Sequence, residues 1–199
     1  MAHLLIHRGL AKKNFTENTI LAFRYCFKKN YGIETDIHCT KDNKIVCFHD
    51  FNLKSKFKIN KSLKNIKYED LLKISKAKRK PIPLLNDLIK LSKNKKFLML
   101  EIKPLFSKEN LKILLSEIKI LKNYSLTSFK EKNIINLYNK KKNLPKILFQ
   151  LLDIALKKNM ESKQIFILQK IINSYVFMTS LSKELLSQIK VSKIYITKI

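Results

Sequence analysis

Residues 32–50 constrain the fold more than any other stretch of this sequence. Small or apolar side chains alternate with polar ones over residues 33–40, and an apolar run resumes at residues 45–48 after four polar positions. A period of two residues is typical of a β-strand, so the stretch predicts two short strands joined by a turn. The connection is too short for a parallel crossover, which needs about a dozen residues, so we expect an antiparallel hairpin.

The predicted hairpin gathers reactive side chains at one rim. Glu34 and Asp36 share a face because alternate residues of a strand point the same way, and His49 follows the second strand. Carboxylate oxygens bind hard divalent cations, and an imidazole exchanges protons near neutral pH. The hairpin therefore combines metal ligands with a group suited to proton transfer.

Length and composition indicate one globular domain. The chain has 199 residues, of which 45% are hydrophobic. A chain of this size buries roughly 70% of the surface that its unfolded form exposes, which is enough for a substantial core. No repeat, low-complexity linker or break in composition divides the sequence, so we expect residues 1–199 to form a single domain.

The net charge of +27 raises the question of nucleic-acid binding. Recognition of nucleic acid relies on arginine, yet the chain has only three arginines, Arg8, Arg24 and Arg79. Its lysines are spread along the whole sequence. We therefore favour a solvated lysine surface over specific nucleic-acid binding, although such a charge raises nonspecific affinity for any phosphate.

The sequence shows no targeting or membrane signal. Its first residues lack the charged and apolar regions of a secretory leader, and no run approaches the roughly 18 apolar residues of a transmembrane helix. We expect a cytoplasmic protein with no transmembrane segment. Cys26, Cys39 and Cys47 are odd in number and lack CxxC spacing, which predicts buried thiols rather than disulfides or a zinc ribbon.

Hydrophobic patterning predicts alternating strands and helices around the hairpin. Further strands are expected at residues 3–7, 97–103, 124–129, 145–152, 175–178 and 193–197. Helices are expected at residues 16–30, capped by Thr16 or Asn18, and at residues 68–75, 86–93, 110–122, 131–140, 165–172 and 181–189. This alternation, with polar side chains at the carboxyl ends of strands, is typical of a TIM-type (β/α) barrel.

The chain has only two glycines, Gly9 and Gly32. One follows a His-Arg pair directly, and the other directly precedes the strand that carries the carboxylates. We predict that each occupies a position where a Cβ atom is not tolerated.

Polar residues from four elements are expected to converge on one rim: His7, Arg8, Glu34, Asp36, His49, Glu101 and Lys103. Each of them alone is more often structural than functional, but their joint placement favours a site. The three carboxylates suit Mg²⁺ or Ca²⁺, and the arginine with the lysine suits a phosphate beside that metal. The two histidines suit the general base and general acid of phosphodiester cleavage.

The ordered motifs resemble those of the glycerophosphodiester phosphodiesterase family. They are His7-Arg8-Gly9, Glu17-Asn18-Thr19, Glu34-Thr35-Asp36, Thr40-Lys41-Asp42, His49-Asp50 and Glu101-Ile102-Lys103, with weaker matches at Ile82-Pro83-Leu84, Ser128-Phe129 and Tyr195-Ile196-Thr197. The resemblance implies a TIM-type barrel that releases an alcohol and sn-glycerol 3-phosphate. It also implies one divalent cation, Mg²⁺ or Ca²⁺, on Glu34, Asp36 and Glu101. Acid/base catalysis is then expected of His7 and His49, and phosphate binding of Arg8 and Lys103.

Several departures from the family pattern carry expectations of their own. Asn43 stands where the family has a turn glycine, which predicts a left-handed backbone there. The sequence stops where relatives continue, so we expect a C-terminally truncated barrel that is short by about one βα unit. Its open edge is then covered by a second copy in a homo-oligomer, or closed by the remaining units, or left open in a weakly active protein.

Three functions remain in competition at this level. The first, which we favour, is metal-dependent hydrolysis of glycerophosphodiesters such as glycerophosphocholine or glycerophosphoethanolamine, or of a related lysophospholipid. The second is a catalytically weak or inactive barrel that binds phosphodiesters or a protein partner. The third is a basic nucleic-acid-binding protein, whose affinity would fall steeply with salt.

Overall fold

The structure of the chain is a computed structural model, and it describes residues 5–9, 16–140 and 196–197. The strands expected at residues 145–152 and 175–178 and the helices expected at residues 165–172 and 181–189 lie outside the described residues.

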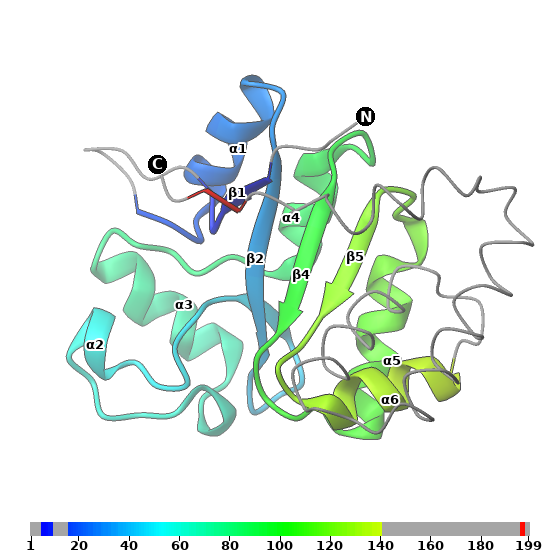
Figure 1. Cartoon of the computed structure of the whole chain (residues 1–199). Helices are drawn as coiled ribbons and strands as arrows, with labels where there is room; N and C mark the ends of the chain where they lie inside the picture. Colours follow the sequence, from blue (N-terminus) through cyan, green and yellow to red (C-terminus); the bar gives the residue numbers. More distant parts are fainter. Residues whose placement is uncertain (1–4, 10–15, 141–195, 198–199) are drawn as a thin grey trace, which may run out of the picture.

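A parallel β-sheet forms the centre of the described chain (Figure 1). Its strands, in the order β5-β4-β2-β1-β6, are β5 (Tyr124–Thr127), β4 (Leu98–Ile102), β2 (Gly32–Cys39), β1 (Leu5–His7) and β6 (Ile196–Thr197). The parallel strands β1, β2, β4 and β5 lie side by side in sequence order, and β6 from the C-terminal part of the sequence pairs with β1. This order is that of a TIM-type (β/α) barrel, of which the described residues form a part.

The hairpin expected at residues 32–50 is confirmed. Strand β3 (Ile45–Cys47) runs antiparallel to β2, with Ile37 opposite Cys47. The turn between them contains Asn43 with a φ of 58°, which is the left-handed conformation predicted for this glycine replacement. The Asn43 N–H donates to the carbonyl oxygen of Thr40 at 3.0 Å. Strands β1 and β3 pair with the same edge of β2, β1 with residues 32–34 and β3 with residues 37–39. The last residue of β3 therefore lies near the last residue of β1.

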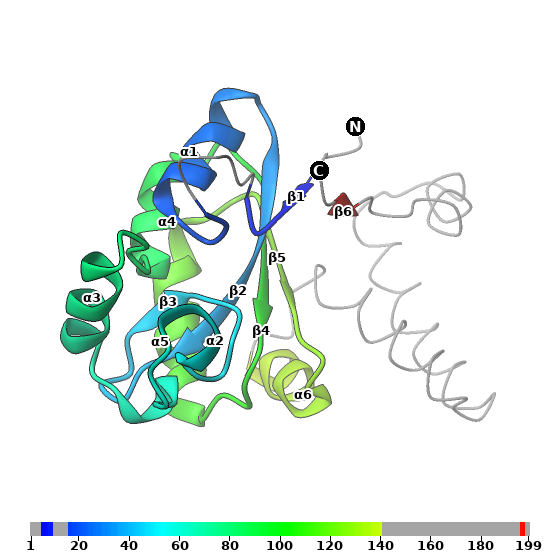
Figure 2. The ribbon, with the colours of Figure 1, turned by 90° about the vertical axis from the view of Figure 1, so that its left-hand side faces the viewer.

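Helices flank the sheet. They are α1 (Ile20–Lys28), α2 (Lys54–Phe57), α3 (Tyr68–Ala77), α4 (Leu85–Ser92), α5 (Lys108–Glu117) and α6 (Glu131–Lys140), with 3₁₀ turns at Leu63–Asn65 and Ile118–Ile120. Figure 2 shows α1, α4 and α5 on the same side of the sheet, whereas α6 lies beside the ends of β4 and β5. The apolar residues of β2 and β4 face the helices, which leaves Glu34, Asp36 and Glu101 on the opposite face.

Helix α1 begins later than the sequence predicts. Thr16 and Asn18 were the expected caps, but Thr19 is the N-cap, and its hydroxyl accepts from the Ala22 N–H at 3.3 Å. Asn18 instead has a φ of 54°, and its Oδ1 accepts from the Thr35 hydroxyl at 2.7 Å. The Asn18 side chain is therefore bound to strand β2 and cannot cap the helix.

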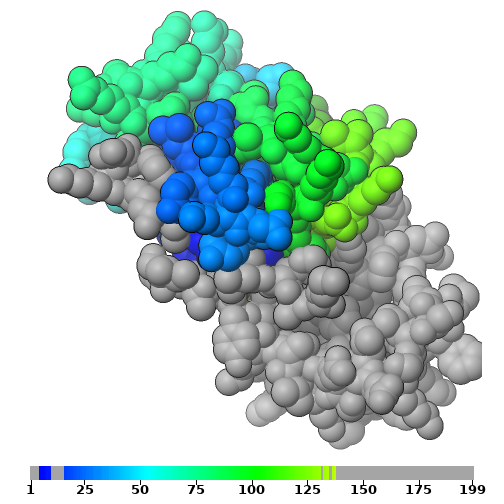
Figure 3. All heavy atoms as spheres, turned by 90° about the horizontal axis from the view of Figure 1, so that it is seen from above, coloured from blue at the N-terminus to red at the C-terminus, as the bar shows by residue number. Residues whose placement is uncertain are grey.

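The segment from residue 51 to residue 80 contains more structure than the single helix expected there. It adds α2 and a 3₁₀ turn to α3, and it has a hydrophobic cluster of its own: Val46, Phe48, Leu53, Phe57, Leu63, Ile66, Leu71 and Ile82. Seen from above in Figure 3, the teal residues of this segment lie against the blue and green residues of the rest of the described chain. The cluster anchors α2 beside the end of β3, because Phe48 follows β3 directly.

The prediction for the two glycines is confirmed by their surroundings. A Cβ atom on Gly32 would lie 2.5 Å from the Leu5 Cδ2 atom and 2.8 Å from the Phe97 carbonyl oxygen. Gly9 has a φ of +73°, and a Cβ there would lie 2.9 Å from the Phe23 ring. Both positions exclude a side chain, so they hold β1, β2 and α1 at close range.

The cysteine prediction also agrees with the described residues. Cys26 and Cys47 are buried, Cys39 is half-buried, and all three are free thiols. None of the helices in the described ranges is long and apolar enough to cross a membrane.

Candidate active site

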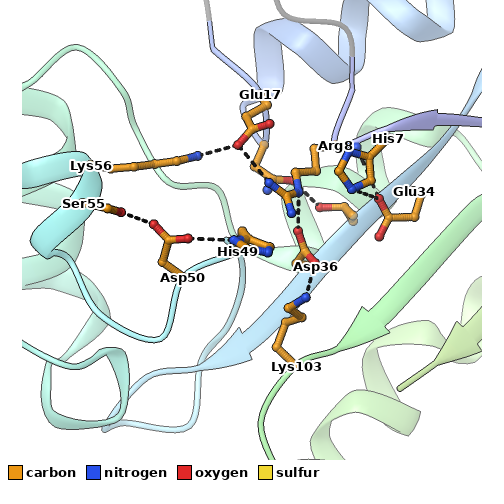
Figure 4. A network of polar contacts seen from close by, with 12 residues as sticks. His7, Arg8, Glu17, Glu34, Asp36, His49, Asp50, Ser55, Lys56 and Lys103 are labelled. Carbon is orange, nitrogen blue, oxygen red and sulfur yellow. Dashed lines mark hydrogen bonds and ion pairs between the residues drawn. The ribbon is translucent and has the colours of Figure 1, made fainter. Parts of the chain in front are cut away.

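The residues expected to form a site do come together, at the ends of β1 and β4 and the middle of β2 (Figure 4). Strand register explains this convergence. His7 lies opposite Glu34 across the β1–β2 pair, and Asp36 lies opposite Glu101 across the β2–β4 pair. The Phe48 N–H donates to the Asp36 carbonyl oxygen at 3.0 Å, which brings the following His49 to the same end of β2.

The three carboxylates form a compact cluster. Glu34, Asp36 and Glu101 each offer one oxygen, and these oxygens all lie within 4.8 Å of one another. The Glu34 and Asp36 side chains are buried, and Glu101 is partly buried. An oxygen-only donor set of this kind fits a hard divalent cation such as Mg²⁺ or Ca²⁺.

Without a bound metal ion, the ionised form of Glu34 is unfavourable. Burial, followed by repulsion from Asp36 and Glu101, raises the pKa of Glu34 from its ordinary value of 4.5 to about 8. The hydrogen bond that Glu34 Oε2 accepts from the Arg8 N–H, at 3.3 Å, opposes this rise only in part. A bound divalent cation would favour the ionised form of all three carboxylates.

Two cationic side chains flank Asp36. The Arg8 Nε atom lies 3.0 Å from Asp36 Oδ2, and the Lys103 Nζ atom lies 3.3 Å from Asp36 Oδ1. Lys103 also lies 2.9 Å from Glu101 Oε1. Burial lowers the pKa of Lys103, but its hydrogen bond to Glu101 and the charge of Asp36 outweigh burial, so the pKa is raised and the ammonium stays charged. A phosphate at this position would meet two cations beside the carboxylate cluster.

The backbone helps to aim Arg8. Strand β1 ends at His7, and Arg8 adopts a left-handed conformation with a φ of 57°. Its N–H donates to the Glu34 carbonyl oxygen at 2.8 Å, and its carbonyl oxygen accepts from the Asn18 N–H at 2.7 Å. A strained conformation held by bonds on both sides is typical of functional sites. It turns the Arg8 side chain toward Asp36 rather than along the strand.

The two histidines approach the site from different strands. The His7 Nε2 atom lies 3.8 Å from Glu34 Oε2, next to the carboxylate cluster. The His49 Nδ1 atom lies 2.7 Å from Asp50 Oδ1. His49 also lines a pocket of about 390 Å³, together with Asp50, Phe51, Asn52, Ser55 and Lys103. This pocket gives a ligand access to His49 and to a cationic side chain at the same time.

Five further residues complete the network but were given no role from the sequence. They are Glu17, His38, Asp50, Ser55 and Lys56. Glu17 and Asp50 lie inside motifs of the family, which was the available signal. His38 shares the strand face of Glu34 and Asp36, so alternation along β2 could have identified it. Ser55 and Lys56 had no signal, because the four-residue helix α2 is too short to show a hydrophobic period.

His38 supports the loop that carries His49. Burial lowers the pKa of His38 from 6.5 to about 4, so the ring is neutral at pH 7. Its Nε2 atom lies 3.1 Å from the His49 carbonyl oxygen, and a carbonyl only accepts, so Nε2–H is the donor. His38 therefore holds the His49 backbone. The Phe51 ring packs edge-on against the His38 ring, with 5.1 Å between the ring centroids.

Comparison with known proteins gives matches that cover only part of each protein. Over 66 residues the chain is 41% identical to lysophospholipase D GDPD1 of Homo sapiens, a match that covers 33% of this chain and 21% of the human protein. Over 72 residues it is 35% identical to a glycerophosphodiester phosphodiesterase of Bacillus altitudinis, covering 36% of this chain and 29% of that protein. The matches thus span less than a third of these curated relatives.

Solved structures extend the likeness of the fold. A glycerophosphodiester phosphodiesterase from Thermotoga maritima matches with a TM-score of 0.60 and 19% identity, covering 88% of this chain and 81% of that one. An Oleispira antarctica phosphodiesterase in complex with the product sn-glycerol-3-phosphate matches with a TM-score of 0.61 and 18% identity, covering 71% and 63%. The model of the glycerophosphoryl diester phosphodiesterase family matches residues 7–187, and this chain therefore belongs to that family.

Proposed function

We propose that this protein is a metal-dependent phosphodiesterase that hydrolyses glycerophosphodiesters to sn-glycerol 3-phosphate and an alcohol. The observation that carries the proposal is the carboxylate cluster within 4.8 Å, flanked by the Arg8 and Lys103 cations. Membership of the family supports it, as does the product sn-glycerol-3-phosphate held by the Oleispira antarctica relative. We also propose that the chain acts as one domain, because a single family model spans residues 7–187. A homo-oligomer stays a prediction.

In this proposal Glu34, Asp36 and Glu101 hold one Mg²⁺ or Ca²⁺ ion. The ion supplies Lewis-acid stabilisation of the negative charge that develops on the phosphoryl oxygens. Arg8 and Lys103 bind the remaining phosphate oxygens and orient the phosphorus atom. Arg8 suits this task because its planar guanidinium offers several donors, whereas Lys103 contributes a point charge.

His7 and His49 divide the proton transfers in this proposal. Cleavage of a phosphodiester requires one oxygen to lose a proton as it attacks and the leaving alcohol to gain one. The Asp50 carboxylate only accepts, so His49 carries its hydrogen on Nδ1 and exchanges the catalytic proton through Nε2. His7 is placed at the opposite side of the cluster, next to Glu34. The two imidazoles are therefore suited to the two proton transfers, one to the attacking oxygen's proton and one to the leaving alcohol.

The test is a panel of glycerophosphodiesters incubated with the full chain and Mg²⁺ or Ca²⁺, with and without a chelator. We expect release of sn-glycerol 3-phosphate that the chelator abolishes. His49→Ala and Lys103→Ala should remove it, while Lys95→Ala, which changes an exposed lysine, should not. Substrate binding without any turnover would overturn the proposal in favour of a phosphodiester-binding barrel.

A further inference from the structure

Helix α2 contributes two consecutive side chains to the network around the site (Figure 4). The Ser55 hydroxyl donates to Asp50 Oδ2, and the other oxygen of Asp50 lies 2.7 Å from His49 Nδ1. Lys56 Nζ lies 2.9 Å from Glu17 Oε1. The same Glu17 oxygen lies 3.3 Å from Arg8 Nη1. One turn of helix is thus connected through a carboxylate to His49 and through a second carboxylate to Arg8.

We propose that Ser55 and Lys56 are positioning residues, which orient His49 for proton transfer and Arg8 for phosphate binding. The inference rests on the proposed function, because it assumes the roles given there to His49 and Arg8. Neither residue lies in the family motifs named above, and neither contacts the carboxylate cluster in the contacts described above. In this proposal Lys56 acts through Glu17, and Ser55 acts through Asp50 besides lining the pocket beside His49.

The connection to His49 works by fixing one carboxylate. A carboxylate with a single partner can rotate, but Asp50 has Ser55 on one oxygen and His49 on the other. Burial raises the pKa of Asp50, and the hydrogen bonds from Ser55 and His49 outweigh it, so the pKa lies below its ordinary value. Asp50 therefore remains an acceptor near pH 7. It keeps the hydrogen of His49 on Nδ1, and loss of Ser55 would loosen this arrangement.

The connection to Arg8 works by balancing charge. Glu17 lies between Lys56 and Arg8, while Arg8 itself lies between Glu17 and Asp36. Burial raises the pKa of Glu17, but the bond and charge of Lys56, followed by those of Arg8, lower it below its ordinary value. Without Lys56, the ionised Glu17 would be paired with Arg8 alone. The guanidinium would then be drawn toward Glu17 and away from an incoming phosphate.

Helix α2 is held firmly enough to act as a support. Phe57 is buried in the hydrophobic cluster of the segment from residue 51 to residue 80, as is Leu53. Lys56 Nζ also lies 5.5 Å from the centroid of the Phe48 ring, which directly precedes His49. Ser55 is exposed and Lys56 half-buried, so these side chains contribute little to folding. Ion pairs near the surface add little to stability, so the two variants should fold.

The first test compares steady-state kinetics of the full chain with its variants. We expect Ser55→Ala to lower kcat about tenfold with little change in KM, since an acid/base group contributes roughly 10²–10⁴-fold. Lys56→Ala should instead raise KM several-fold and leave kcat nearly unchanged. Ser55→Thr and Lys56→Arg should restore most of each loss. Lys54→Ala, an exposed lysine of the same helix, is the charge-matched control and should behave as the unmutated chain.

The second test needs no turnover. Nitrogen-15 spectra of the imidazoles, with His49 identified by His49→Gln, should show hydrogen on Nδ1 in the unmutated chain and a mixture of tautomers in Ser55→Ala. Calorimetry with inorganic phosphate and Mg²⁺ should show weaker binding by Lys56→Ala than by Lys54→Ala. Unchanged tautomers together with unchanged phosphate affinity would overturn the inference. An unmutated chain that hydrolyses nothing, yet shows both effects, would instead count against the proposed function alone.

Discussion

Arg8 and Asp36 form an ion pair of 3.0 Å, which joins a side chain assigned to phosphate binding to one assigned to metal binding. Lys103 makes the equivalent contact from the other side, at 3.3 Å. In the structure, therefore, Asp36 and Glu101 are paired with the same cations that a phosphate would require. A divalent cation that takes over the carboxylates would release the cations for phosphate, so the two ligands should bind with positive coupling.

This coupling can be measured with the product. We expect sn-glycerol 3-phosphate to bind at least about tenfold more tightly in the presence of Mg²⁺ or Ca²⁺ than with a chelator, within the usual range for coupled sites. Linkage requires that the product tighten metal binding by the same factor. Isothermal titrations in both orders test this, and Arg8→Lys should reduce the coupling because it loses the planar donor set. Equal product affinity with and without metal would contradict the shared-carboxylate arrangement.

Metal binding should depend on the cluster and not on acidic residues in general. A ligand that binds only the folded state stabilises it by about 2.7 kcal/mol at a concentration of 100 Kd, so saturating Mg²⁺ or Ca²⁺ should raise the Tm. Glu101→Gln should abolish most of this shift, since it removes one ligand without changing the shape of the side chain. Glu109→Gln, at an exposed position on α5, is the matched control and should keep the full shift. A Glu101→Gln protein that retains the shift would place the metal elsewhere.

The features that followed from the sequence are those set by short-range patterns. Alternation over residues 33–40 predicts both the hairpin and the shared face of Glu34 and Asp36, because one period of two produces both. The Thr19 cap could not be predicted in the same way. It depends on the bond between Asn18 and Thr35, which exists only once β2 lies beside the start of α1. Neighbouring positions alone favoured Thr16 or Asn18 as the cap.

Contacts across the segment from residue 51 to residue 80 were equally inaccessible. Glu17 and Lys56 are 39 positions apart, and nothing in either neighbourhood identifies the other as its partner. Helix α2 has four residues, fewer than an amphipathic pattern needs. Its place is set by Leu53 and Phe57 in the hydrophobic cluster beneath it, which is a tertiary effect. The carboxylates and cations of the site were thus predictable, and the residues that orient them were not.

The stability of the metal-free protein should fall as the pH rises from about 6.5 to about 8. The folded state keeps a proton on Glu34, whose pKa is about 8, whereas the unfolded chain loses it near 4.5. The folded state thus binds more protons in this interval, and Glu34 alone lowers stability by at most about 1.4 kcal/mol per pH unit. Glu117, with a pKa of about 7, acts in the same direction. His38, whose pKa falls from 6.5 to about 4, acts in the opposite direction, but only below pH 6.5.

Urea unfolding with a chelator at several pH values measures this slope. Glu34→Gln should flatten it between pH 7 and 8, because the amide does not titrate. Saturating divalent cation should reverse it, since the metal needs the ionised carboxylate and so binds more tightly as the pH rises. A stability that rises with pH in the chelated protein would show that Glu34 is already ionised near neutrality.

Gly32→Ala should be strongly destabilising, although it adds a single methyl group. The Cβ would lie 2.5 Å from the Leu5 side chain and 2.8 Å from the Phe97 carbonyl oxygen, so β1 or the start of β4 has to move. Overpacking of this kind costs about 1–3 kcal/mol, and the displaced strands carry His7 and Glu101. We therefore expect a lower urea midpoint together with weaker metal binding. Ser116→Ala, at an exposed position on α5, is the control variant and should change neither the urea midpoint nor metal binding. A Gly32→Ala protein as stable as the unmutated chain would mean that the close contact between β1 and β2 is easily relaxed, and that the glycine is not required for the site.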